Sequence, residues 1–199
     1  MTLTIGLTGS IASGKSTISL MFDDYNIPVI DADKISREVV NPGEGAYDKI
    51  IQAFGPEIVQ ADEMIDRKKL GSIIFADEEK RKQLNDIVHP AVRKRMLERR
   101  DAFIKAGIKC VVLDIPLLYE SKLTHFVNKT LVVFVDEKVQ LNRLMERDGY
   151  GEAEALQRIQ SQIPVNEKAK LADAFIDNNG TKYESYNQLE KVLRNWDVL

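Results

Sequence analysis

Nine residues near the N-terminus have the types and spacing of a phosphate-binding loop. The segment Gly9-Ser10-Ile11-Ala12-Ser13-Gly14-Lys15-Ser16-Thr17 matches the pattern G-x-x-x-x-G-K-[ST]. In such a loop the glycines let successive backbone N–H groups point inward at an anion, and the N-terminus of the following helix adds partial positive charge. We expect Lys15 to reach the β- and γ-phosphates of a nucleoside triphosphate, and the Ser16 hydroxyl to bind Mg²⁺.

The residues on either side of this loop predict the two elements that must position it. Residues 3–7 are a short apolar run typical of a buried strand, and residues 16–22 carry apolar side chains at helical spacing. A chance glycine-rich turn is the alternative interpretation, but a strand, a glycine turn and a helix in this order favour the loop. The sequence therefore predicts that the protein binds a nucleoside triphosphate.

Aspartates that directly follow predicted strands form a second group of candidate functional residues. Asp31, Asp114 and Asp136 follow the second, third and fourth strands along the chain. The carboxyl ends of parallel strands form the ligand-facing edge of a sheet, where a carboxylate is well placed to support a metal or a substrate. An N-cap of the next helix is the alternative role. We favour the N-cap for Asp136 and a functional role for Asp31 and Asp114.

The composition and the net charge limit the partners and the cellular compartment that we expect for this protein. The chain has 199 residues, of which 44% are hydrophobic and 30% charged, and its net charge is −3. This near balance does not favour a nucleic acid or an anionic membrane as a partner. The single cysteine, Cys110, cannot form an internal disulfide, which is typical of a reducing compartment. With no signal-peptide pattern and no long apolar stretch, we expect a cytoplasmic protein, either a monomer or a weak homo-oligomer.

The order of apolar runs and helical patterns predicts the fold. Strands that alternate with helices indicate an α/β protein with a five-stranded parallel sheet and helices on both faces, an arrangement that resembles the nucleoside-monophosphate-kinase-like P-loop NTPases. We expect one domain over residues 1–199, with a helical acceptor-binding insertion and a helical lid. The strands are predicted over residues 3–7, 28–30, 109–113, 130–135 and 174–176. The core is predicted over residues 1–42, 108–136 and 166–199, the insertion over 43–107 and the lid over 137–165.

The insertion is predicted to be mostly helical. Asp66 and Asp77 are typical N-caps, and the helix after Asp77 is expected to run to about residue 106 with one apolar face buried. Pro90 lies inside this long helix, where a proline should kink or break it. A proline within such a regular pattern suggests that a bend there forms part of a pocket wall.

Cationic side chains on two predicted helices are candidates for binding phosphates. Arg93, one turn beyond His89, is the best placed residue of the insertion to contact an anionic substrate, whereas the basic residues that follow it are typical of a solvated face. In the lid, Arg143 and Arg147 lie on one helical face, and the glycines within residues 148–151 indicate the turn of a mobile lid. Salt bridges to local glutamates are the alternative for the two lid arginines. A phosphoryl-transfer site needs cationic donors near the γ-phosphate, which favours the functional interpretation.

Three classes of phosphate-loop protein compete for this pattern. A switch GTPase needs an Asn-Lys-x-Asp motif, and the only Asn-Lys pair, Asn128-Lys129, lacks the aspartate. A transporter or motor ATPase needs a signature loop or a much longer chain. A small-molecule kinase needs a phosphate loop, an acceptor-binding insertion and an arginine-bearing lid, and the sequence predicts all three.

With these residues in place, the sequence resembles the dephospho-coenzyme A kinase family over essentially its whole length. The phosphate loop alone is generic, but the combination of motifs after it is specific. These motifs, in chain order, are Asp31-Ala32-Asp33-Lys34-Ile35-Ser36-Arg37, His89-Pro90-Ala91-Val92-Arg93, Asp114-Ile115-Pro116-Leu117-Leu118-Tyr119-Glu120, the lid helix from Gln140 to Asp148, and the final strand and turn from Ala172 to Asn178. One departure is Gly151, which stands near the place where the family often has serine or threonine at the start of the second lid helix.

The resemblance implies an ATP-dependent enzyme of coenzyme A synthesis. It implies transfer of the γ-phosphoryl group of ATP, with Mg²⁺, to the ribose 3′-hydroxyl of dephospho-coenzyme A, which is the last step of that synthesis. The residues by themselves leave two alternatives open. One is a kinase for another small hydroxyl acceptor, such as a nucleoside, a nucleotide or a sugar acid, and the other is a module that binds ATP without transferring phosphate.

The chemistry of phosphoryl transfer assigns a role to each candidate. The expected catalytic residues are Lys15, which holds the β- and γ-phosphates, Asp33, which orients the attacking hydroxyl, and Arg143, which offsets charge in the transition state. Either Asp31 or Asp114 is expected to support, through water, the Mg²⁺ held by Ser16. The expected ATP-binding residues are the nine of the loop together with Arg143, Arg147 and Asn178. The expected acceptor-binding residues are Asp33, His89, Arg93, Leu117, Leu118 and Tyr119.

Overall fold

The computed structural model describes residues 2–199. The chain folds as two compact units, one made of residues 1–30 and 103–199 and the other of residues 31–102. The first unit contains the phosphate loop, most of the sheet and the predicted lid, and the second contains most of the predicted insertion. None of the helices formed by the described residues is both long enough and apolar enough to span a membrane.

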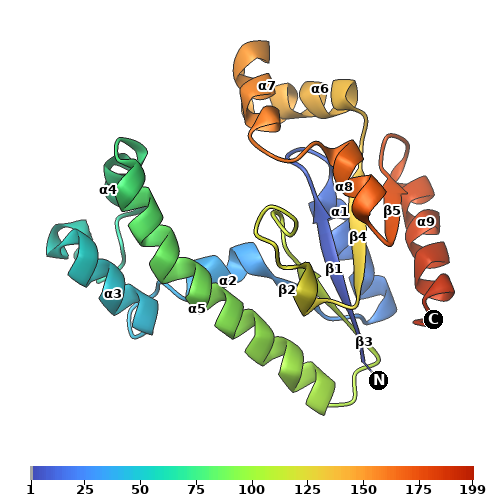
Figure 1. Ribbon diagram of the computed structural model, residues 1–199, viewed down its shortest axis with the longest axis horizontal. Helices are drawn as coiled ribbons and strands as arrows, with labels where there is room; N and C mark the ends of the chain where they lie inside the picture. The colour runs from blue at the N-terminus through green and yellow to red at the C-terminus, as the bar shows by residue number, and fades with distance from the viewer. Residues whose placement is uncertain (1) are drawn as a thin grey trace. The chain divides into compact units, whose positions relative to one another are not determined.

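A five-stranded sheet is the centre of the first unit, with the strand order β2-β3-β1-β4-β5 (Figure 1). The strands are β1 Leu3–Gly9, β2 Val29–Asp31, β3 Cys110–Asp114, β4 Lys129–Phe134 and β5 Ala174–Asp177. β1 pairs in parallel with both β3 and β4, and β4 pairs in parallel with β5. The prediction of a five-stranded parallel sheet is confirmed, and each strand lies within two residues of its predicted bounds. The sheet thereby brings the end of β1 next to the ends of β3 and β4.

One face of the sheet packs against helices from the two ends of the chain. These are α1 (Lys15–Met21), the 3-10 helix η1 (Phe22–Tyr25) and α9 (Lys182–Asn195). Ile5 and Leu7 of β1 belong to one buried cluster with Phe22 and Leu189, and Cys110 of β3 lies in the same cluster with 2% of its surface exposed. Helix α9 therefore closes this side of the core, because it covers the apolar residues that alternate along the strands.

The opposite face of the sheet is covered by the segment after β3 and by α8 (Val165–Leu171), which contacts β4. Gly6 of β1 lies on this face, and a methyl group added there would lie 2.9 Å from the Leu118 side chain and 3.1 Å from Val127. Leu118 is fully buried against the strand, whereas its neighbour Leu117 is 41% exposed. The 3-10 helix η3 (Thr124–Phe126) lies in the same segment, just before β4. The small residue at position 6 therefore lets this segment approach the sheet closely.

The predicted lid consists of α6 (Glu137–Asp148) and α7 (Glu152–Gln160). Gly149 ends α6 in the left-handed conformation, with φ 72°, and Gly151 begins α7 without a side-chain cap. Leu144 of α6 and two residues of α7 form a small buried cluster, against which Ile11 and Ala12 of the phosphate loop pack. The predicted turn between two helices is present, and apolar contacts connect these helices to the phosphate loop, while their role as a mobile lid stays a prediction.

The second unit is helical. It contains α2 (Ala32–Glu38), α3 (Gly45–Phe54), the 3-10 helix η2 (Pro56–Ile58), α4 (Arg67–Phe75) and the greater part of α5 (Glu78–Lys105). Its core includes Tyr47, Ile50 and Leu70, with Leu84 and Ile87 of α5 packed against it. As predicted, the carboxylate of Asp66 caps α4, and the carboxylate of Asp77 accepts a bond from Lys80 N (3.1 Å) at the start of α5.

Helix α5 continues through Pro90 without a break, so a break at this residue is not found. The proline removes the N–H that would bond to the carbonyl of Asp86, a loss that costs about 3 kcal/mol in a helix interior. Contacts on both sides of Pro90 offset this cost. Ile87 packs into the core of the unit, and Arg95 forms an ion pair with Glu44 at 2.8 Å.

The difference between two adjacent leucines provides a test of the sheet packing. Because Leu118 is fully buried against β1, Leu118→Ala should lower the free energy of unfolding by about 2–5 kcal/mol, measured by urea denaturation. The control is Leu117→Ala, which removes the same atoms from a half-exposed position and should cost less than about 1 kcal/mol. Equal losses for the two variants would contradict this account of the face covered by Leu118.

Candidate active site

The phosphate loop connects the end of β1 at Gly9 to the start of α1 at Lys15, as its sequence predicts. Gly14 has φ 86°, a conformation that residues with a side chain rarely adopt, and a methyl group there would collide with Nδ2 of Asn178. A methyl group on Gly9 would lie 2.5 Å from Oγ of Ser13. Both glycines are therefore required by close contacts within the folded loop as well as by backbone conformation.

Three carbonyl groups of the loop accept hydrogen bonds from side chains of distant elements. Lys168 Nζ donates to the carbonyl of Gly9 at 2.8 Å, and Gln140 Nε2 donates to that of Ile11 at 2.7 Å. Asn178 Nδ2 donates to the carbonyl of Ser13 at 2.8 Å. The three carbonyls belong to alternate peptides of the loop, so the three donors hold every second peptide in place.

This pattern of carbonyl bonds determines where the N–H groups of the loop point. In a planar trans peptide the C=O and the N–H point in opposite directions. In each of these peptides the N–H group, of Ser10, Ala12 or Gly14, therefore points away from the side chain that holds the carbonyl. The first N–H groups of α1 also lack partners within the helix. The loop thus presents a set of fixed donors with the chemistry of a phosphate site.

Lys15, the expected phosphate-binding lysine, forms an ion pair with Asp114. Asp114 ends β3 directly beside Leu7 of β1, and only 3% of its surface is exposed. The side chain of Lys15 is 19% exposed. The structure thus joins two residues for which the sequence predicts separate roles, and it gives Asp114 a direct contact with the lysine of the phosphate loop. Support of a metal through water stays a prediction for Asp114.

The two lid arginines differ in their surroundings. Arg143 Nη2 donates to the backbone carbonyl of Asn178 at 3.0 Å, and its guanidinium would lie 3.9 Å from a methyl group on Gly14. Arg147 instead donates twice to Asp148, at 2.8 Å each, and its side chain is 57% exposed. These hydrogen bonds to Asp148 raise the pKa of Arg147. The structure therefore brings Arg143 to the phosphate loop, while Arg147 makes the kind of local salt bridge considered as the alternative.

Asn178 supports the phosphate loop from a buried position. Its Nδ2 donates to Ser13, and its Oδ1 accepts a hydrogen bond from Ser185 Oγ at 2.9 Å. Both ends of the side chain are therefore used within the protein. A direct contact of Asn178 with ATP, which is expected from the sequence, stays a prediction.

Asp31 and Asp33 lie at the start of α2. The carboxylate of Asp31 accepts bonds from the backbone N–H groups of Asp33 (2.9 Å) and Lys34 (3.0 Å), and Asp33 is exposed in the first turn. Asp31 thus forms the N-cap that we had considered its alternative role. In contrast, Asp136 stands at the N-cap position of α6 without a side-chain cap bond. The sequence alone could not distinguish them, because aspartate is favoured at both kinds of site.

The donors available for a divalent metal are few. Within residues 2–199, no group of three or more His, Cys, Asp or Glu side chains could hold a metal ion. Ser16 lies exposed in the first turn of α1, beside the loop amides. This donor set suits Mg²⁺ in a nucleotide site, because Mg²⁺ there takes most of its ligands from phosphates and water and only one or two from the protein.

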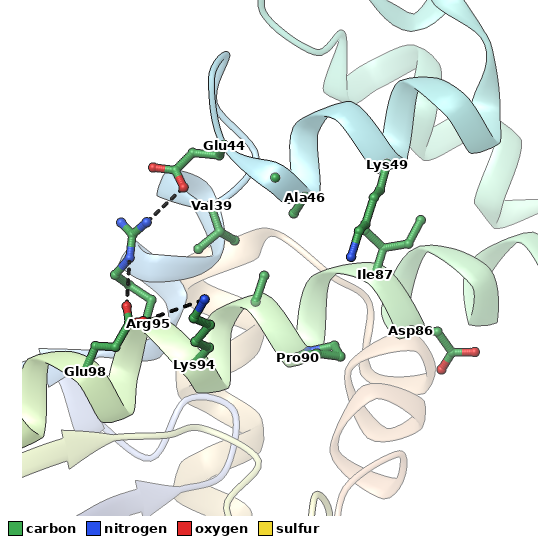
Figure 2. Close-up of a pocket in the computed structure, with 12 residues that line it drawn as sticks. Val39, Glu44, Ala46, Lys49, Asp86, Ile87, Pro90, Lys94, Arg95 and Glu98 are labelled. Carbon is green, nitrogen blue, oxygen red and sulfur yellow. Dashed lines mark hydrogen bonds and ion pairs between the residues drawn. The ribbon is translucent and has the colours of Figure 1, made fainter.

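The predicted acceptor-binding residues belong to both units, Asp33, His89 and Arg93 to the second and Leu117, Leu118 and Tyr119 to the first. His89 is exposed and Arg93 half-buried on α5, and neither lines the pocket of about 620 Å³ within the second unit (Figure 2). That pocket is lined from α3 by Ala46 and Lys49 and from α5 by Asp86, Ile87, Pro90, Lys94 and Arg95.

The three consecutive residues predicted after β3 also have different surroundings. Leu117 is exposed, whereas Leu118 is fully buried and has no surface to offer an acceptor. Tyr119 lines a separate open pocket of about 370 Å³ with Thr124 and Asp173, and burial raises the pKa of its hydroxyl. Neighbouring side chains in an irregular segment point in different directions, which the sequence motif does not reveal.

Two residues that contact the loop were missed as functional candidates. Gln140 shares a helical face with Arg143, so it could have been found from its spacing on α6. Lys168 is fully buried on α8. A lysine in a short polar helix is typical of a solvated surface, and no sequence signal distinguishes it from its exposed neighbour Lys170.

The comparisons with known proteins agree with this site. The family described as dephospho-CoA kinase matches residues 3–184 of the chain. The chain belongs to this family. The dephospho-CoA kinase of Oceanobacillus iheyensis is 63% identical over 198 residues, which is 100% of each chain. A crystal structure from Thermus thermophilus is similar with a TM-score of 0.82 at 31% identity, covering 98% of this chain and 97% of the other. The dephospho-CoA kinase of Campylobacter jejuni has a TM-score of 0.77 at 31% identity, covering 98% of both chains.

Two glycines with similar backbone angles provide a test of the loop geometry. Gly14→Ala should weaken binding of an ATP analogue by at least about tenfold, measured by calorimetry, because the new methyl group must displace Asn178 from the loop. Gly149→Ala is the matched control: its φ is 72°, but nothing lies within 4 Å of the added methyl group, so nucleotide affinity should stay unchanged. Equal effects of the two changes would assign the loss to backbone strain alone.

Proposed function

We propose that this protein transfers the γ-phosphoryl group of ATP to the ribose 3′-hydroxyl of dephospho-coenzyme A, and thereby completes coenzyme A. The observation that carries the proposal is the family match, which runs through residues 3–184 and so includes the phosphate loop, the insertion and the lid. The geometry of the loop supports it, because bonds to the carbonyls of alternate peptides fix the directions of their N–H groups.

Lys15 is proposed to hold the β- and γ-phosphates once nucleotide is bound. Its ammonium then exchanges part of its contact with Asp114 for phosphate oxygens, while Asp114 keeps the long side chain from swinging into solvent. Such preorganisation matters because phosphoryl transfer depends on positioning and on electrostatic stabilisation more than on covalent chemistry. Ser16 is proposed to hold Mg²⁺, with Asp31 or Asp114 supporting it through water. When bound, Mg²⁺ offsets the negative charge of the phosphates.

Arg143 is proposed to stabilise the charge that develops on the transferred group. Its bond to the carbonyl of Asn178 fixes one side of the guanidinium, and the remaining N–H groups stay available to the triphosphate. Arg147 is proposed to contribute less, because contact with phosphate would require it to leave Asp148.

Asp33 is proposed to orient the attacking 3′-hydroxyl. Its backbone N–H is bonded to the Asp31 carboxylate, so the N-cap of α2 fixes the first turn from which Asp33 extends. A ribose hydroxyl is a weak nucleophile, and a carboxylate that aligns it lowers the entropic part of the barrier. His89, Arg93 and Leu117 are proposed to contact the rest of the acceptor.

The proposed partners are small molecules alone. A net charge of −3 does not favour nucleic acid or an anionic membrane surface, and the single cysteine fits a reducing cytoplasm. We propose a monomer or a weak homo-oligomer, because the reaction assigned here needs one phosphate loop and one acceptor site per chain.

A panel of acceptors tests the proposed reaction. ADP release is measured with ATP, Mg²⁺ and either dephospho-coenzyme A, a nucleoside, a nucleoside monophosphate or gluconate, and rapid release is expected with dephospho-coenzyme A alone. The Lys15→Ala protein serves as the control for contaminating ATPases and should show no turnover. Rapid release with another acceptor would assign a different kinase activity, and no release with any of them would indicate a binding module.

The role of Asp33 is tested by measuring kcat and the KM for ATP separately. Asp33→Asn should lower kcat by about a hundredfold or more while leaving the KM for ATP nearly unchanged, because it removes the charge that aligns the hydroxyl. The control is Asp48→Asn, which alters an exposed carboxylate on α3. If Asp33→Asn instead weakened ATP binding without lowering kcat, Asp33 would belong to the metal site.

A further inference from the structure

A fully buried lysine contacts the phosphate loop and takes no part in the mechanism above. Lys168 of α8 has no exposed surface. Its Nζ donates to the carbonyl of Gly9 at 2.8 Å and forms an ion pair with Oε1 of Glu120 at 2.7 Å. Lysine is rarely buried to this extent, so the pair is an unusual feature of the core.

Glu120 extends these contacts to the end of the lid. Its Oε1 also accepts a hydrogen bond from the backbone N–H of Ile163 at 3.1 Å. Ile163 lies between α7 and α8, and its carbonyl accepts a hydrogen bond from Ser10 Oγ at 3.4 Å. The neighbouring Gln162 accepts one from the N–H of Ile11 at 3.0 Å. The pair therefore lies where the phosphate loop and the C-terminal end of the lid meet.

The energetics of a buried ion pair do not favour a purely stabilising role. Removing two charges from water costs several kcal/mol per ion, and an apolar pair of similar volume is often equally or more stable. Glu120 increases this cost, because its Oε2 is buried and has no hydrogen-bond partner among the described residues. A pair that contributes little to stability but orients a functional peptide is better explained by its effect on that peptide.

The peptide in question joins Gly9 to Ser10. Because Lys168 holds the Gly9 carbonyl, the Ser10 N–H points the opposite way, away from the ammonium, at the end of the strand where Gly9 pairs with Val133 of β4. The charge of the ammonium also polarises this peptide, which strengthens its N–H as a donor. Gln140 and Asn178 act on the other two peptides as neutral donors, so Lys168 is the charged member of the set.

We propose that Lys168, held by Glu120, is a positioning residue for phosphoryl transfer. It fixes the first peptide of the phosphate loop, where the loop leaves β1, and it couples that peptide to the end of the lid at Ile163. This inference rests on the proposed function, because the loop must hold a transferable phosphoryl group for the position of the peptide to affect turnover.

Three variants separate positioning from stability. Lys168→Met removes the ammonium at nearly constant length, Glu120→Gln removes the charge but keeps an acceptor for Ile163, and the double variant removes both charges. The matched control is Lys170→Met, which changes an exposed lysine of the same helix that is paired with Glu167. All are assayed at a temperature at which circular dichroism finds them folded, for kcat, for both KM values and for ADP affinity by calorimetry.

The double variant is the decisive measurement. Lys168→Met should lower kcat by about 10- to 100-fold and weaken ADP binding, because a loop that is displaced where it leaves β1 no longer positions the phosphates well. The double variant should recover thermal stability relative to Lys168→Met, since no uncompensated buried charge remains, but it should not recover kcat. Lys170→Met should match the wild type in every assay.

Several outcomes would overturn the inference. Recovery of kcat together with stability in the double variant would assign the pair to stability alone, as would a kcat of Lys168→Met within threefold of the wild type. Failure of both Lys168 variants to fold at any temperature would do the same. A wild-type protein without activity on dephospho-coenzyme A would overturn the proposed function instead, and ADP affinity would still test whether Lys168 positions the loop.

Discussion

The attachment of alternate peptide carbonyls to fixed side chains is the constraint on which the phosphate site depends. A loop of glycines and small residues has no preferred direction for its N–H groups. Lys168, Gln140 and Asn178 supply that direction from α8, α6 and the turn after β5. Since each peptide is planar, a side chain that holds the carbonyl of a peptide also fixes the direction of the N–H of that peptide. The loss of conformational entropy that comes with ordering the loop therefore occurs during folding and not during nucleotide binding.

The same contacts explain why elements far apart in the chain must fold before the site exists. The three bonds connect residues separated by 159, 129 and 165 positions. The parallel sheet makes this possible, because its order places β1 between β3 and β4, and β5 beside β4. Asp114 and Asn178, each at or just after the end of a strand, thus meet the loop from two sides. A phosphate loop peptide alone would have the right sequence without these attachments.

Features encoded by neighbouring residues were predictable from the sequence, and features that depend on packing were not. The loop, its strand and its helix follow a local pattern, and the caps at Asp66 and Asp77 depend on residues within one helical turn. The uninterrupted course of α5 through Pro90 was not predictable, because contacts with α3 and with its N-cap residue Glu44 outweigh the local effect of the proline. Leu117 and Leu118 are identical in type, and only the folded chain shows which one is buried. Lys168 and Lys170 are likewise identical in type, and only the folded chain shows that Lys168 is the buried one.

The position of the single cysteine matters for an enzyme whose proposed acceptor and product both carry a free thiol. Cys110 lies in β3 within the main core, and burial raises the pKa of its thiol to about 12. Exchange with the disulfide form of such a metabolite requires an accessible thiolate, which Cys110 does not provide at neutral pH. The chain can therefore work in contact with a pool of reactive sulfur compounds without being covalently trapped by them.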